Sequence, residues 1–117
     1  MRISQDKDKY MKYYLESICF KGELQVYNIK QMAESRGQGA EYISCSFDPD
    51  DEDYKKGYVT LLFWKPAEVE DTMVYVENNM FYVCLEKLCD NHKKKKPDTE
   101  KELDYYLREI KKNLHIK

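Results

Sequence analysis

The chain has 117 residues, enough for one domain with a single hydrophobic core and too few for two domains joined by a linker. Apolar residues make up 42% and charged residues 36%, which excludes a collagenous or disordered chain and fits a globular domain with a strongly solvated surface. The net charge of −2 is unevenly distributed, since residues 48–71 carry eight acids against three lysines and residues 87–117 carry ten basic residues against six acids. We therefore expect one polarised domain over 1–117, whose acidic part binds a basic partner.

The N-terminal third favours two helices. Residues 5–19 repeat apolar side chains at i, i+3, i+4 and i+7, which places them on one helical face, and Ser4 is the expected N-cap. Residues 23–35 alternate like a strand at first and then repeat at helical spacing, so both readings are open. We predict a helix, because the glycines of RGQG (36–39) would end one well.

The period then changes to that of strands. EYISCSF (41–47) alternates, and YVTLLFW (58–64) and TMVYVEN (72–78) are rich in β-branched and aromatic residues. Short polar turns separate the three segments, which predicts an antiparallel meander. The first turn is the acidic run, and the second is KPAEVED (65–71).

Two helices are expected to close the chain. After Asn78 and Asn79, both good caps, apolar residues recur at helical spacing to about Lys94, and Pro97 follows. Thr99 and Glu102 form the T-x-x-E pattern of a capping box before a final amphipathic helix that reaches Leu114. The order α-α-β-β-β-α-α predicts an α+β fold, with helices packed on an antiparallel sheet of three or more strands.

The pattern gives little support to catalysis, a cofactor or a metal. Cys84, Cys89 and His92 lack the paired spacing of zinc ligands, so we expect Cys84 to pack in the core and His92 to lie at the surface or partly buried. The four cysteines, also including Cys19 and Cys45, are read as reduced and mostly buried thiols. The KKKK run (93–96) lacks interleaved aromatics and fits a solvated helix end better than a nucleic-acid site.

Calcium and phosphate motifs are also incomplete. Counted from Asp48, the acidic run has Asp53 and Val59 where a calcium loop needs glycine and glutamate. No G-x-x-x-x-G-K-[ST] phosphate loop occurs.

The acidic turns remain as the candidate binding surface. A charge run is often only a solubilising loop, but here aromatic side chains that could anchor a partner accompany it. The candidate partner-binding residues are Asp48, Asp50, Asp51, Glu52, Asp53, Tyr54, Tyr58, Trp64, Glu68, Glu70 and Asp71. Such a surface could imitate the polyanion that a basic enzyme binds.

The segment from about Ser46 to Leu114 resembles the immunity proteins of bacterial contact-dependent growth inhibition systems, in the group that neutralises ribonuclease toxins. The residues that carry the resemblance are SFDPDDEDYKKGYVTLLFW, VYVENN, MFYVCLEKLCDNH, a KKP break and TEKELDYYLREIKKNL.

The resemblance implies a protein without enzymatic activity that binds the C-terminal ribonuclease domain of its cognate toxin, one to one, and blocks access to RNA. No apolar run approaches the roughly 18 to 20 residues of a membrane span, and the N-terminus lacks the apolar core of a secretion signal, so we expect the cytoplasm. The alternative is a small cytoplasmic adaptor or regulatory domain that binds another basic protein through the same acidic turn.

Overall fold

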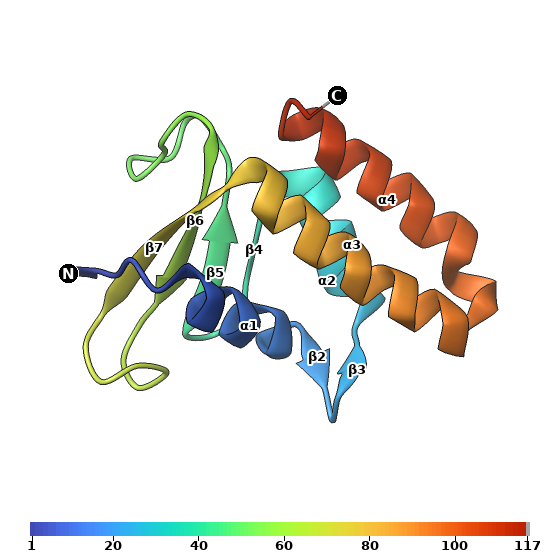
Figure 1. Cartoon of the computed structure of the whole chain (residues 1–117), viewed down its shortest axis with the longest axis horizontal. Coiled ribbons are helices and arrows are strands. Elements are labelled where there is room, and N and C mark those ends of the chain that lie inside the picture. Colours follow the sequence, from blue (N-terminus) through green and yellow to red (C-terminus); the bar gives the residue numbers. More distant parts are fainter. Residues whose placement is uncertain (117) are drawn as a thin grey trace.

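The computed structural model describes residues 1–116, in which helices gather on one side of a twisted sheet (Figure 1). The elements in chain order are β1 (Arg2–Ile3), α1 (Lys7–Ser17), β2 (Cys19–Phe20), β3 (Glu23–Leu24), α2 (Val26–Ser35), β4 (Gly37–Gly39), β5 (Ile43–Ser46), β6 (Tyr58–Phe63), β7 (Thr72–Glu77), α3 (Asn78–Lys95), the 3-10 turn η1 (Pro97–Thr99) and α4 (Glu100–Asn113). The α+β class is confirmed, whereas the predicted element order is only partly right, because β1 to β4 were not expected.

The main sheet has the strand order β1-β7-β6-β5-β4. The predicted antiparallel meander forms its centre, with Tyr58 opposite Glu77 and Phe63 opposite Thr72 in the β6–β7 pair. A purely antiparallel sheet was wrong, because β1 pairs parallel to β7. The Arg2 N–H bonds to the Asp71 carbonyl, and the Ser4 N–H, just after the strand, bonds to the Met73 carbonyl of β7. A two-residue strand is too short to leave a periodic pattern in the sequence.

Alternation along β6 decides which face of the sheet meets the helices. Val59, Leu61 and Phe63 are completely buried in the core cluster with residues of α1 and α3. The intervening side chains, including Thr60, point to the opposite face, as the period of two requires. The predicted strand content of 58–64 is thereby confirmed and its inward side assigned.

The helix at the N-terminus begins later than predicted and has a different cap. Asp6 is the N-cap of α1, because its Oδ1 accepts a bond from the Lys9 backbone N–H at 3.3 Å. Ser4 Oγ instead accepts from the Asp6 N–H at 3.1 Å. Ser4 was therefore the wrong cap, although it orders the turn that leads into the helix.

The predicted helix over 23–35 is confirmed in its second part only. Residues 19–24 form the β2–β3 hairpin, whose turn holds Lys21 and Gly22 at φ values of 53° and 78°. The helix α2 ends at Arg36 with φ 55°, so no glycine ends it. Gly37 belongs to β4, where a Cβ atom would lie 2.8 Å from the Cys45 carbonyl oxygen. The backbone approach within the sheet therefore explains this glycine.

Of the caps predicted for the last two helices, Thr99 stands at the N-cap of α4 but makes no side-chain capping bond, and Asn78 was wrong. Asn78 is the first residue of α3, not its cap, and donates from Nδ2 to the Leu114 carbonyl at 3.1 Å. Thr99 donates its hydroxyl back to the Lys96 carbonyl at 2.7 Å, and Glu102 accepts from Tyr106, so the capping box does not form. Asn78 thus joins the start of α3 to the end of α4, whereas Thr99 orders the turn between these two helices.

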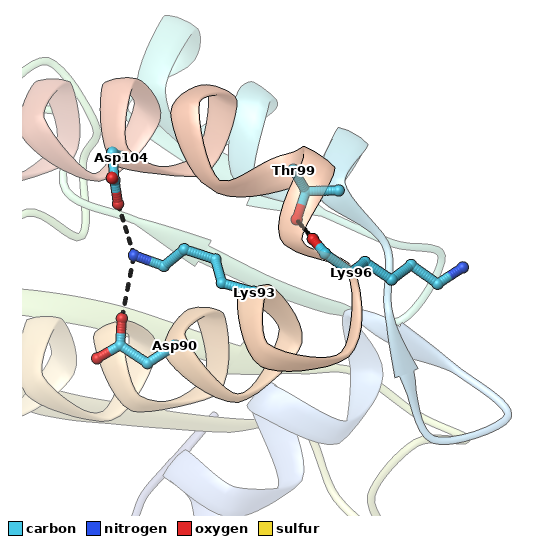
Figure 2. Close-up of polar contacts among 5 residues, drawn as sticks. All are labelled: Asp90, Lys93, Lys96, Thr99 and Asp104. Atoms are coloured by element: carbon cyan, nitrogen blue, oxygen red, sulfur yellow. Dashed lines mark hydrogen bonds and ion pairs between the residues drawn. The ribbon is translucent and has the colours of Figure 1, made fainter.

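Part of the lysine run joins two helices (Figure 2). Lys93 Nζ lies 3.1 Å from Asp90 Oδ1 within α3 and 2.5 Å from Asp104 Oδ1 on α4. Asp104 first, and then Asp90, raise the pKa of the Lys93 ammonium group. Lys96 pairs with Glu23 of β3 at 2.8 Å. These two lysines are therefore structural contacts, and the expectation of a freely solvated terminus holds only for their neighbours.

A buried polar chain fixes α1, α2 and the sheet edge relative to one another. Tyr14, fully buried on α1, donates to Gln38 Oε1 at 2.9 Å and lies 3.1 Å from Cys45 Sγ. Gln38 Nε2 donates to Asn28 Oδ1 at 3.1 Å, and Asn28 Nδ2 donates to the Ile18 carbonyl at 3.0 Å. The side-chain amides of Gln38 and Asn28 thus each donate one bond and accept one, as buried polar groups require.

Candidate protein-binding surface

The loop between β5 and β6 carries the acidic run, and its own side chains fold it. Asp48 Oδ1 accepts a bond from the Asp50 N–H at 3.0 Å, and Asp51 Oδ1 accepts from the Asp53 N–H at 3.2 Å. Two consecutive aspartate turns of this kind explain why aspartate recurs here. Asp48 and Asp51 therefore have a structural role besides their charge.

Exposure separates the five acids of this loop. Asp50 and Glu52 are exposed, whereas Asp48, Asp51 and Asp53 are partly buried. Within residues 1–116 none of the five forms an ion pair. The negative charge of this loop is therefore not neutralised by direct contact with a basic side chain of the described chain.

The loop bends onto the face of the sheet that the helices leave free. The Asp53 carbonyl accepts bonds from the Thr60 hydroxyl at 3.2 Å and from the Tyr75 hydroxyl at 3.1 Å. Lys55 Nζ lies 4.5 Å from the Tyr58 ring centroid and 5.2 Å from that of Tyr75. Tyr58 is thus half-buried and already contacts a cation of its own chain.

The second acidic group lies in the loop between β6 and β7, where two of its three carboxylates have bonding partners. Asp71 Oδ1 accepts from the Lys65 N–H at 2.9 Å. Glu68 accepts from the Val69 N–H at 3.0 Å and from the Tyr10 hydroxyl at 2.9 Å, and these two bonds lower the pKa of the Glu68 carboxyl. Glu70 is exposed, and no hydrogen bond or ion pair within residues 1–116 involves its side chain.

The structure places the two acidic groups at opposite ends of the sheet. One loop precedes Tyr58 and the other follows Phe63, so the full length of β6 separates them, about 20 Å for six residues (Figure 1). Trp64, 38% exposed, lies at the second end, whereas Tyr54 and Tyr58 lie at the first. The eleven candidate residues therefore form two separate surfaces.

The cysteines and His92 form no such surface. All four cysteines are free, with Cys45 and Cys89 buried and Cys19 and Cys84 half-buried. His92 is 6% exposed, so the expectation of a surface or partly buried histidine was wrong: helix α3 turns this residue inward. Across the part of the chain that the structure describes, no group of three or more His, Cys, Asp or Glu side chains is arranged to hold a metal ion.

The sequence interpretation missed one concave surface. A groove of about 680 Å³ runs between α1 and α3, with Met11, Leu15, Met80, Cys84 and Leu88 along it. The signal was present in Met80–Leu85, six consecutive apolar residues on one helix, more than one buried face needs. Cys84 lines this groove, so its predicted core position is only partly right.

A comparison of the whole sequence with known proteins gives a family match. A family model described as CDI immunity protein, where CDI denotes contact-dependent growth inhibition, matches residues 7–107. The comparisons with curated proteins and with solved structures gave no match. Among residues 1–116, no helix is long and apolar enough to cross a bilayer. The matched segment runs from α1 into α4 and extends the resemblance to nearly the whole chain, which therefore belongs to the CDI immunity protein family.

Proposed function

We propose that this protein binds a cognate toxin domain with ribonuclease activity and neutralises it by blocking access to RNA, without chemistry of its own. Membership of the CDI immunity protein family is the observation that carries the proposal. A stoichiometric complex of one toxin domain and one immunity protein, formed in the cytoplasm, fits that role.

The β5–β6 loop is the part of the surface that we assign to the toxin. A ribonuclease binds RNA, a polyanion, in a basic cleft. The carboxylates of Asp50, Glu52 and Asp53 form no ion pair within the described chain, and the positive potential of such a cleft would attract them as it attracts RNA. Charges of this kind increase the rate of association and select the partner, whereas buried contacts supply most of the affinity. Tyr54 and Tyr58, half-buried beside the loop, would be such contacts.

The second acidic group is a weaker candidate for this contact. Glu68 and Asp71 already accept hydrogen bonds that order their own loop, and Glu70 is the one of the three carboxylates with no hydrogen bond or ion pair within residues 1–116. Trp64 would be the aromatic contact of that surface. We therefore place it outside the toxin contact and use it as a reference surface.

An RNA-cleavage assay tests the function. The cognate toxin domain is titrated with this protein, and cleavage of total RNA is followed at a fixed toxin concentration. We expect cleavage to stop at one equivalent and the immunity protein to stay unaltered. Cleavage that continues in a large excess of the protein would contradict neutralisation, and a toxin domain that cleaves DNA and leaves RNA intact would contradict the ribonuclease assignment.

A further inference from the structure

The groove between α1 and α3 is an apolar concavity that the mechanism proposed above does not use. Its floor is made of Met11 and Leu15 from α1 and of Met80, Cys84 and Leu88 from α3. On α3 these residues are spaced i, i+4 and i+8, so they form one straight apolar row along the helix. The groove therefore has the length of about two helical turns.

This row is a second apolar face of α3. Phe81 and Leu85 of the same helix are completely buried on the face that packs in the core. Met80 and Cys84 are only half-buried, and Val83 beside them is 45% exposed. The apolar side of α3 is therefore wider than the part that the core buries. Within residues 1–116 no element covers this side.

The β2–β3 hairpin lies at the end of the groove and carries an exposed apolar side chain. Its turn residue Gly22 lines the groove, and Phe20 beside it is 65% exposed. The hairpin projects beyond the body of the molecule at the lower edge of Figure 1. The ion pair of Glu23 with Lys96 links the hairpin to the chain segment after α3. Phe20 is thus an exposed aromatic side chain on the hairpin, next to the apolar groove.

The charge at the tip of the hairpin is complementary to the net charge of the groove rim. The α1 rim of the groove carries Asp8, Lys12 and Glu16 at four-residue spacing, with a net charge of −1, and Glu16 lies nearest to the hairpin in the chain. Lys21, next to Phe20, is exposed at the hairpin tip. None of these four side chains forms an ion pair within the described chain. The tip therefore offers an apolar ring and a cation, and the groove offers an apolar floor and an acidic rim.

We propose that a second copy of this chain fills the groove, with Phe20 of each copy inserted between α1 and α3 of the other and Lys21 paired with Glu16 across the interface. A two-fold dimer needs one self-complementary patch that contains both the inserted group and its receptor, and the hairpin and the groove share such a patch. The acidic β5–β6 loop is not part of it. The dimer is thus independent of the proposed toxin contact.

Sedimentation velocity of the full chain without toxin, across about 1 to 500 µM, tests the dimer. We expect a monomer–dimer equilibrium that Phe20→Ser shifts toward monomer by about 30-fold or more in the dissociation constant, the effect of losing a central aromatic anchor. Tyr27→Ser is the matched control, since Tyr27 is also an aromatic residue 65% exposed but lies outside the groove. It should leave the equilibrium unchanged.

A charge swap tests the pairing. Lys21→Glu should weaken the dimer, and Glu16→Lys in the same chain should restore it, because the two charges then meet with reversed signs. Phe20, Lys21 and Glu16 are exposed, so circular dichroism should give the same melting temperature for all variants within a few degrees.

Two results would overturn the proposal: a wild type that is monomeric at every concentration, or a dimer that Phe20→Ser leaves intact. In the first case, a toxin affinity that falls on Phe20→Ser would assign the groove to the toxin domain instead.

Discussion

At the scale of single residues, the fold depends on buried polar groups that have few other hydrogen-bond partners. The Tyr14 hydroxyl joins α1 to Gln38 of β4 and to Cys45 of β5. Tyr14→Phe should reduce the free energy of unfolding by about 1 to 3 kcal/mol, because it leaves a buried amide oxygen without its donor. Urea denaturation measures this loss. Tyr27→Phe, at an exposed position, should change it by less than about 0.5 kcal/mol, and equal effects of the two substitutions would contradict this role of Tyr14.

The buried thiols make the free energy of unfolding depend on pH in the alkaline range. Burial raises the pKa of Cys45 to about 11 and that of Cys89 to about 12, from 9.0 for an exposed thiol. Above pH 9 the unfolded chain loses these protons and the folded chain keeps them, so the free energy of unfolding should fall as pH rises from 9 toward 11. Urea titrations at several pH values measure the slope. Cys89→Ala should reduce the slope, and a slope that this substitution leaves unchanged would contradict the assignment.

Helix caps were the residue-scale feature that sequence reasoning assigned worst. Ser4 and Asn78 are good capping residues, yet Asp6 caps α1 and Asn78 bonds to the Leu114 carbonyl. Thr99 stands at the N-cap of α4, but its hydroxyl bonds back to the Lys96 carbonyl and caps no N–H group. A cap depends on where the chain enters a helix, and tertiary packing decides this within one or two residues. The acids of the β5–β6 loop have the same property, since only the structure distinguishes Asp51, which accepts a backbone bond, from Asp50.

At the scale of elements, Lys93 connects the last two helices through Asp90 and Asp104 (Figure 2). Both carboxylates are about half exposed, so the contact should be modest. Lys93→Met should reduce the free energy of unfolding by about 0.5 to 1 kcal/mol, and the same substitution in an Asp104→Asn background should have less effect. Lys94→Met, at an exposed neighbouring position, is the control. A loss that stays the same in the Asp104→Asn background would contradict the interhelical pair.

The elements that could be predicted are those with long periodic patterns. The strands β6 and β7 match their predicted bounds within one residue, and the helix α3 matches within two. The strands β1 to β4 have two or three residues each, too few for an alternating pattern to be recognised in the sequence. Their partners decide that they are strands: β1 exists because β7 offers a free edge, and β4 because β5 does.

At the scale of the molecule, the charge polarity predicted from the sequence resolves into two acidic surfaces. Their separation follows from the meander, because successive turns of a meander lie at opposite ends of the strand that they share. The separation could therefore have been predicted together with the meander. The apolar groove could be anticipated only in part. The Met80–Leu85 run signals a second apolar face, but which helix stands opposite depends on long-range packing.

The central claim is that the β5–β6 loop guides the protein to a basic toxin domain. Its most direct test is the association rate constant with that domain, measured by stopped flow at increasing salt for the wild type and for two variants. Asp50→Lys with Glu52→Lys reverses two exposed charges that have no structural bond through their side chains, and Glu70→Lys reverses an exposed charge at the other end of β6. We predict that the double variant associates about tenfold or more slowly at low salt, that salt reduces the difference, and that Glu70→Lys stays within about twofold of the wild type. Equal rates for the wild type and the double variant, or an equal decrease for Glu70→Lys, would contradict the claim.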